Sequence, residues 1–109
     1  MANADCIGKM VVIPPHDYQT HEVVMYLAAI RDGRMYFFDE FGDRIQLHED
    51  DVVLRLATRH EVAEDFLRDA GFRGSLKELP PEKADPLADR IYADVTEKCK
   101  AKASEWNFM

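Results

Sequence analysis

The segment 22–58 constrains the fold of this chain most strongly, because it consists of short apolar, β-prone runs separated by compact turn signals. These signals lie at 31–33, 39–43 and 48–51 and consist mainly of glycine and acidic residues. Glycine and aspartate tolerate the backbone angles that tight turns between antiparallel strands require. The segment therefore predicts a β-meander with acidic turns.

Five runs are candidate strands, at 9–13, 23–30, 34–38, 44–48 and 52–57. The first is expected at a sheet edge, because Pro14 and Pro15 end it and proline cannot donate to a ladder. The run 23–30 is apolar on both faces, so it also fits a helix within 17–31. We prefer a strand buried on both faces, because its valines and tyrosine favour a pleated sheet and Asp32-Gly33 is a hairpin signal.

A helix is expected over 59–71, because its start and its end both carry specific signals. Thr58 and Glu61 form a capping box, in which each side chain accepts from the other residue's backbone N–H. Gly71 is placed to close the helix in a left-handed conformation, with Leu67 and Phe72 as the apolar pair of a Schellman motif. A connector follows over 72–85, and a second helix is expected over 86–105, with Asp85 as N-cap and Pro86 at its first position.

These elements predict an α+β fold, an antiparallel meander of four to five strands followed by two C-terminal helices packed on the sheet. The sheet could also curl towards a barrel. The 109 residues fit a single domain over 1–109, with 1–58 mainly β and an apolar tail at 106–109.

The charge of the chain is −7, from 21 acidic and 14 basic side chains, which opposes contact with a phosphate backbone. Nucleic acid is therefore a poor partner. No signal peptide or membrane-spanning run is found, so the expected location is cytoplasmic. Cys6 and Cys99 lie in no metal-binding or redox motif and fit buried apolar positions in a reducing compartment, although a bridge between them stays open.

Three histidines are weak catalytic candidates, because imidazole can act as a base or a metal ligand: His16, His21 and His48. They could gather with Asp17 in one site, but no HExxH spacing supports this, and solvated loop histidines are favoured. The acidic turn residues could similarly bind a hard cation: Asp39, Asp43, Asp50 and Asp51. Their spacing does not match an EF-hand, and no cofactor or metal is expected.

Aromatic side chains concentrate on two neighbouring strands, on one turn and in the tail: Tyr26, Tyr36, Phe38, Phe41, Trp106 and Phe108. They could form an internal core, a partner or dimer surface, or the lining of a pocket for a small apolar or aromatic ligand. The tail could fold back onto the sheet or bind a partner.

The absence of a catalytic constellation favours a non-enzymatic protein-interaction or regulatory module that acts as a homodimer, with the aromatic residues as its contact surface. The alternative is a small-molecule-binding protein or hydrolase-like enzyme with an aromatic pocket and a histidine at its rim. A third hypothesis, based on the acidic turns alone, is a decoy that imitates nucleic acid for a basic partner.

Overall fold

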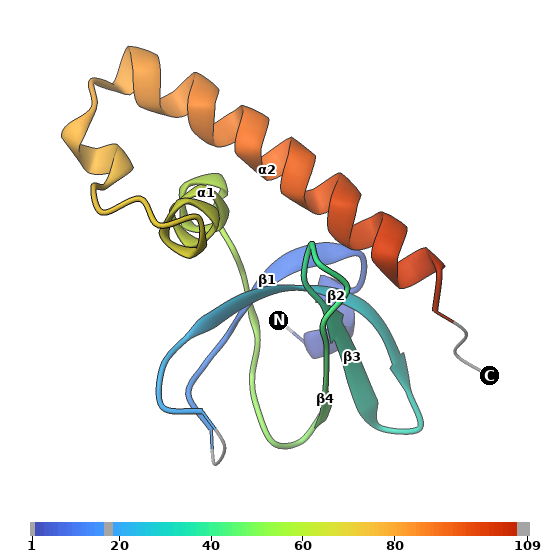
Figure 1. Ribbon diagram of the computed structural model, residues 1–109. Coiled ribbons are helices and arrows are strands. Elements are labelled where there is room, and N and C mark those ends of the chain that lie inside the picture. The colour runs from blue at the N-terminus through green and yellow to red at the C-terminus, as the bar shows by residue number, and fades with distance from the viewer. Residues whose placement is uncertain (1, 17–18, 107–109) are drawn as a thin grey trace.

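The computed structural model describes residues 2–16 and 19–106, and it has the α+β architecture expected from the sequence (Figure 1). Its elements, in chain order, are η1 (Asn3–Cys6), β1 (Lys9–Ile13), β2 (Val23–Arg31), β3 (Arg34–Phe38), β4 (Arg44–His48), β5 (Arg55–Leu56), α1 (Arg59–Asp69), η2 (Leu76–Glu78) and α2 (Pro81–Ser104). The strands form one antiparallel sheet that is not closed into a barrel, and both helices pack on it.

The strand order is β4-β3-β2-β1-β5, so the first four strands form a meander and the fifth returns to the far side of β1. Val11 and Val12 of β1 pair with Leu56 and Arg55. The expected edge position of β1 is therefore wrong, because its two prolines follow the strand and remove no ladder donor. The predicted strand over 52–57 is reduced to two residues.

The run that also fitted a helix is the nine-residue strand β2. It pairs with β1 on one side and with β3 on the other, which satisfies its backbone on both sides. The register with β3 shifts between Leu27 and Ala29, which marks a bulge. Asp32 and Gly33 turn the chain with φ values of 53° and 78°, as the hairpin signal predicted.

Apolar side chains cover both faces of the sheet, and the chain itself covers them. On one face, Tyr26 and Phe38 are buried together with residues of α1 and α2. On the opposite face, Leu27 and Phe37 are buried in a second cluster that also contains Cys6, Val52 and Leu54. The helices thus close one side, while η1 and the segment 52–54 close the other.

Helix α1 has the predicted ends. Thr58 Oγ1 accepts from the Glu61 N–H at 3.1 Å, and a Glu61 carboxylate oxygen accepts from the Thr58 N–H at 2.9 Å. At the other end, Gly71 has φ of 91° and the Phe72 N–H donates to the Leu67 carbonyl at 2.8 Å. Both bonds of a Schellman closure are present, since the Gly71 N–H also donates to the Arg68 carbonyl.

Helix α2 begins at Pro81, earlier than the expected start at Asp85 and Pro86. Pro81 fits the first helical position equally well, so the connector is shorter than 72–85 and Pro86 lies inside the helix. Contacts with α1 hold this early turn, because Ala84 is 3% exposed and Asp85 pairs with His60. The missing Pro86 N–H costs the helix one backbone hydrogen bond.

Candidate functional site

A cleft of about 660 Å³ lies between one end of the sheet and the helix layer. Among the described residues, its rim carries six carboxylates against one guanidinium and one imidazole. The acidic members are Glu22, Asp39, Glu40, Asp43, Asp65 and Asp69. We call this hollow, with the apolar side chains at its base, the acidic cleft.

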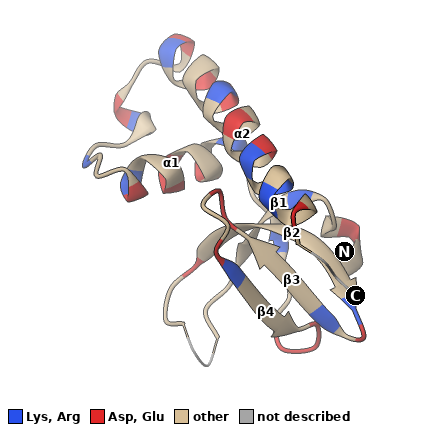
Figure 2. Cartoon of the chain, turned by 45° about the vertical axis from the view of Figure 1, so that its right-hand side comes forward, with Lys and Arg blue, Asp and Glu red and all other residues tan. Residues whose placement is uncertain are grey.

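The turn between β3 and β4 supplies one side of the acidic cleft and projects towards the helices (Figure 2). Asp39 builds this turn, because one of its carboxylate oxygens accepts from the N–H groups of Phe41 and Asp43 at 2.9 and 2.8 Å. Gly42 has φ of 91°, a conformation that glycine adopts without strain. The turn is thus held by its own hydrogen bonds.

Helix α1 supplies the other side through Asp65 and Asp69, which lie one turn apart and therefore on the same helical face. Arg68 pairs with Asp65 at 3.2 Å and is the single Lys or Arg side chain that the described residues contribute to the lining. Within the described part of the chain, the side chain of Asp69 makes no ion pair or hydrogen bond.

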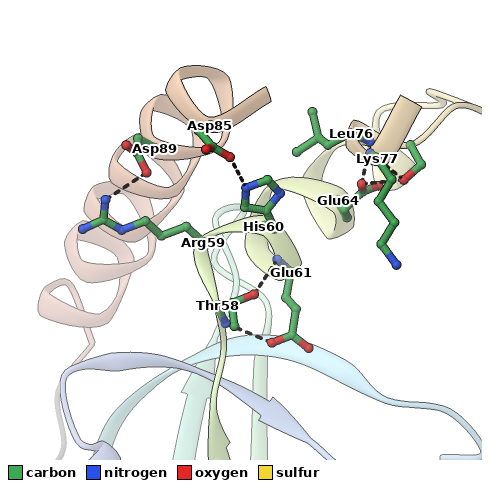
Figure 3. Close-up of polar contacts among 10 residues, drawn as sticks. Thr58, Arg59, His60, Glu61, Glu64, Leu76, Lys77, Asp85 and Asp89 are labelled. Carbon is green, nitrogen blue, oxygen red and sulfur yellow. Dashed lines mark hydrogen bonds and ion pairs between the residues drawn. The ribbon is translucent and has the colours of Figure 1, made fainter. Parts of the chain in front are cut away.

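Polar contacts with α2 and with η2 fix the position of α1 (Figure 3). Arg59 and His60 each contact a carboxylate of α2 at 2.9 Å, those of Asp89 and Asp85. Glu64 accepts from the hydroxyl of Ser75 and from the Leu76 N–H, at 2.8 and 2.6 Å. The helix that carries the cleft carboxylates is therefore anchored on both sides.

Burial raises the pKa values of three carboxylates at the rim of the acidic cleft. Desolvation raises the pKa of Asp39, although the N–H groups of Asp43 and Phe41 oppose the rise. Desolvation also raises the pKa of Glu40, with Lys98 opposing and Asp39 and Asp69 adding to it. The pKa of Asp65 is raised by burial and by Asp69. The turn and α1, distant in sequence, thus share one region of negative potential.

The base of the acidic cleft is apolar, with side chains from β1, β2 and both helices, among them Met10, Val24, Val62, Phe66 and Val95. Cys99 also lines it and is fully buried. Burial raises the pKa of the Cys99 thiol to about 12, so the thiol stays protonated at neutral pH and is a poor nucleophile. A site with this composition can bind a cationic group that carries an apolar stem, but its described residues provide no activated nucleophile.

The candidate histidines do not come together. His21 lines the acidic cleft, where β2 begins. His48 lies at the opposite end of the sheet, where its Nδ1 accepts from the Asp50 N–H at 3.2 Å. His16 forms a bridge with Gln19 in the connector between β1 and β2, and Asp17 lies outside the described residues.

The turn carboxylates do not converge either, because Asp39 and Asp43 precede β4 whereas Asp50 and Asp51 follow it. No group of three or more potential metal ligands exists within residues 2–16 and 19–106. The bridge that the sequence left open between Cys6 and Cys99 is not formed, since both thiols are free and lie in clusters on opposite faces of the sheet.

Most of the candidate aromatic residues belong to the core. Tyr26 and Phe38 are buried, and Trp106 packs on Tyr36 with ring centroids 4.9 Å apart. The chain therefore folds back onto the sheet as far as Trp106, while Phe108 lies outside the described residues. Phe41 differs from the others, since it is 70% exposed at the turn and lines the acidic cleft.

Sequence reasoning missed the contribution of α1 to this site. Asp65 and Asp69 are spaced four apart beside the apolar stripe of the helix, a signal that is also typical of an ordinary solvated face. Nothing local indicates that this face meets a turn lying more than twenty residues earlier in the chain.

Comparison of the chain with protein-family models, with curated proteins and with solved structures gives no match. None of the helices in the described part of the chain combines the length and the apolar character that crossing a membrane requires.

Proposed function

We propose that the protein is a non-enzymatic, cytoplasmic protein-interaction module that binds a basic, partly apolar segment of a partner protein in the acidic cleft. The main support is that carboxylates from two distant segments surround an apolar hollow. A lysine or arginine side chain matches this arrangement, because its aliphatic stem can contact the base while its charged head reaches the rim.

The electrostatics support a charged partner. Desolvation raises the pKa values of Asp39, Glu40 and Asp65, so ionising these carboxylates in the folded protein carries a desolvation cost. A bound cation relieves this cost. Complementary charge of this kind also accelerates association and selects among partners.

The chemistry of the cleft favours binding over catalysis. His21 is its one imidazole, and the Cys99 thiol at its base is protonated at neutral pH. The alternative hypothesis places Tyr26, Tyr36 and Phe38 around a pocket for a small apolar or aromatic ligand, and the packing of Tyr26 and Phe38 against the helices speaks against such a pocket. The acidic cleft could still hold a small apolar ligand that carries an amine, and the butylamine titration below distinguishes such a ligand from a peptide. The free thiols of Cys6 and Cys99 are consistent with the reducing compartment proposed here.

The test is an NMR titration of the isotope-labelled protein with a short peptide of alternating lysine and leucine. Amide shifts are expected at 39–43 and 65–69, and added salt should weaken the binding. A peptide of alternating glutamate and leucine should leave these amides unchanged. Butylamine, which carries a single cation on an apolar stem, should bind far more weakly than the lysine peptide.

Two matched variants localise the effect. The double variant Glu40→Gln with Asp69→Asn removes two charges from the acidic cleft and should weaken peptide binding roughly tenfold. The control, Asp50→Asn with Asp51→Asn, removes the same charge from the opposite end of the sheet and should change affinity little. Equal losses in both variants would indicate attraction to net charge alone, and unshifted cleft amides would refute the proposal.

A further inference from the structure

The sheet has two edge strands, and they differ in length. One is β5, which has two residues, and the other is β4, which has five. Within the described part of the chain, β4 pairs with β3 alone. Its sequence contains neither proline nor lysine, the residues that most often protect a sheet edge from another strand.

The hydrogen-bond pattern shows which backbone groups of β4 face outwards. The Glu49 N–H donates to the Gly33 carbonyl at 2.8 Å, and the Asp39 N–H donates to the Asp43 carbonyl at 3.0 Å. Hydrogen-bonded pairs alternate in an antiparallel ladder. Glu49 and Asp43 both form hydrogen-bonded pairs, so the residues at every second position between them, Leu47 and Ile45, also bond to β3. The N–H and C=O groups of the alternate residues therefore face away from β3.

The outward residues are Arg44, Gln46 and His48, and Gln46 is the middle one. Of their groups, the His48 carbonyl already accepts from the Asp51 N–H at 3.0 Å. A row of three outward-facing residues can pair with the same row of a second copy about a two-fold axis. The middle residue then forms a hydrogen-bonded pair with its counterpart in the second copy.

We propose that the edge of β4 binds the β4 strand of a second copy of this chain, antiparallel and with Gln46 opposite its own counterpart. The two five-stranded sheets then join into one continuous sheet. This proposal concerns a different surface from the acidic cleft and is independent of the function proposed for it.

The side chains of β4 are self-complementary in this register. On the face of the second core cluster, Ile45 meets Leu47 of the second copy, and both are only partly buried in one chain. The ends carry opposite charges, because Arg44, whose guanidinium stacks on Trp106 at 4.3 Å, lies opposite His48 of the second copy and next to its Glu49. Asp43 faces Glu49 of the second copy, and the repulsion between the two carboxylates weakens the dimer. Removing the charge of Asp43 should therefore strengthen self-association.

The experiment is sedimentation velocity on the whole protein over a micromolar concentration series. The wild type should form dimers. Gln46→Lys and Gln46→Glu each place like charges opposite one another and should weaken self-association at least roughly tenfold. An equimolar mixture of these two variants should recover dimers, because an ammonium group of one copy then faces a carboxylate of the other in the same register.

Two further variants separate this register from a general effect of charge. Gln46→Thr stays neutral and suits a strand, so it should dimerise like the wild type. Asp43→Asn should tighten the dimer. Circular dichroism checks that each variant is folded, which is expected because the Gln46 side chain is exposed. A monomeric wild type at high micromolar concentration, a Gln46→Lys dimer as tight as the wild type, or a mixture that fails to recover would each overturn the proposal.

Discussion

The bond between Arg55 and Glu61 joins the sheet to the helix layer, and its removal gives a prediction with a defined pH dependence. Arg55 lies on β5, and its two terminal nitrogens donate to the two carboxylate oxygens of Glu61 at 2.8 and 2.6 Å. The same carboxylate accepts from the Thr58 N–H at the start of α1. Replacing Glu61 by Gln keeps an acceptor for the capping box and removes the charge that pairs with Arg55.

The magnitude follows from the pKa of Glu61, which Arg55 above all, with the Thr58 N–H, lowers from 4.5 to about 2. Each tenfold change in proton affinity is worth about 1.4 kcal/mol, which sets an upper limit of roughly 3 kcal/mol. The side chains of Glu61 and Arg55 are 32% and 49% exposed, so solvent screens the pair. We therefore expect Glu61→Gln to lower the free energy of unfolding by about 1 kcal/mol at neutral pH.

The sign of the pH dependence is fixed because the native pKa of Glu61 lies below the unfolded value. The stabilisation is fully present above pH 4.5 and is lost as the pH falls towards about 2. The difference between wild type and Glu61→Gln, measured by urea unfolding at a series of pH values, should therefore shrink on acidification.

Glu82→Gln is the matched control, because Glu82 is also in a first helical turn but pairs with no arginine in the described part of the chain. It corrects for the loss of a negative charge near a helix N-terminus. If Glu61→Gln destabilises no more than Glu82→Gln, or if its effect is the same at every pH, the ion pair does not contribute as argued.

Three further predictions concern the tail, a thiol and a turn. Trp106→Ala should destabilise by about 2 kcal/mol in urea unfolding followed by circular dichroism, because it removes the packing on Tyr36, and an unchanged midpoint would contradict this. The Cys99 thiol, buried and with its pKa raised to about 12, should resist iodoacetamide in the native protein and react in urea, as measured by mass spectrometry. Labelling of the folded protein at the rate of a free thiol would refute it. Gly42→Ala should cost at least about 1 kcal/mol in thermal unfolding, because the position has φ of 91° and an added Cβ would lie 3.3 Å from Lys102, whereas an unaltered melting temperature would show that the turn relaxes.

Local signals were sufficient to predict α1 to within a residue or two of its ends. Its capping box and Schellman closure each involve residues that are close in sequence, so the pattern contains the whole interaction. The sequence determined the start of α2 less well, because Pro81 and Pro86 are both suitable first residues of a helix. Contacts with α1 favour the earlier start. Tertiary packing therefore determined which of the two possible helix starts is adopted.

Contacts between residues far apart in the sequence explain the other differences between the predicted and the observed structure. The position of β1 depends on Leu56 and Arg55 pairing with Val11 and Val12, which no short-range pattern indicates. The acidic cleft was missed for the same reason, since a turn and a helix form it together. Only its turn carboxylates stood out in the sequence, where they resembled ordinary solvated turn residues.

Three carboxylates of the acidic cleft, those of Asp39, Glu40 and Asp65, oppose the stability of the fold at neutral pH. A raised native pKa means that Asp39, Glu40 and Asp65 bind protons more tightly in the folded chain than in the unfolded one. Stability is therefore lost as the pH rises through these raised values, the reverse of the dependence at Glu61. Asp39 has a structural role that offsets this loss, because it accepts two N–H groups of its turn. Among the described residues, Glu40 makes no such recorded backbone bond, and Asp65 has only its pairing with Arg68. The cationic partner proposed above would offset this loss, because its positive charge would stabilise the ionised carboxylates.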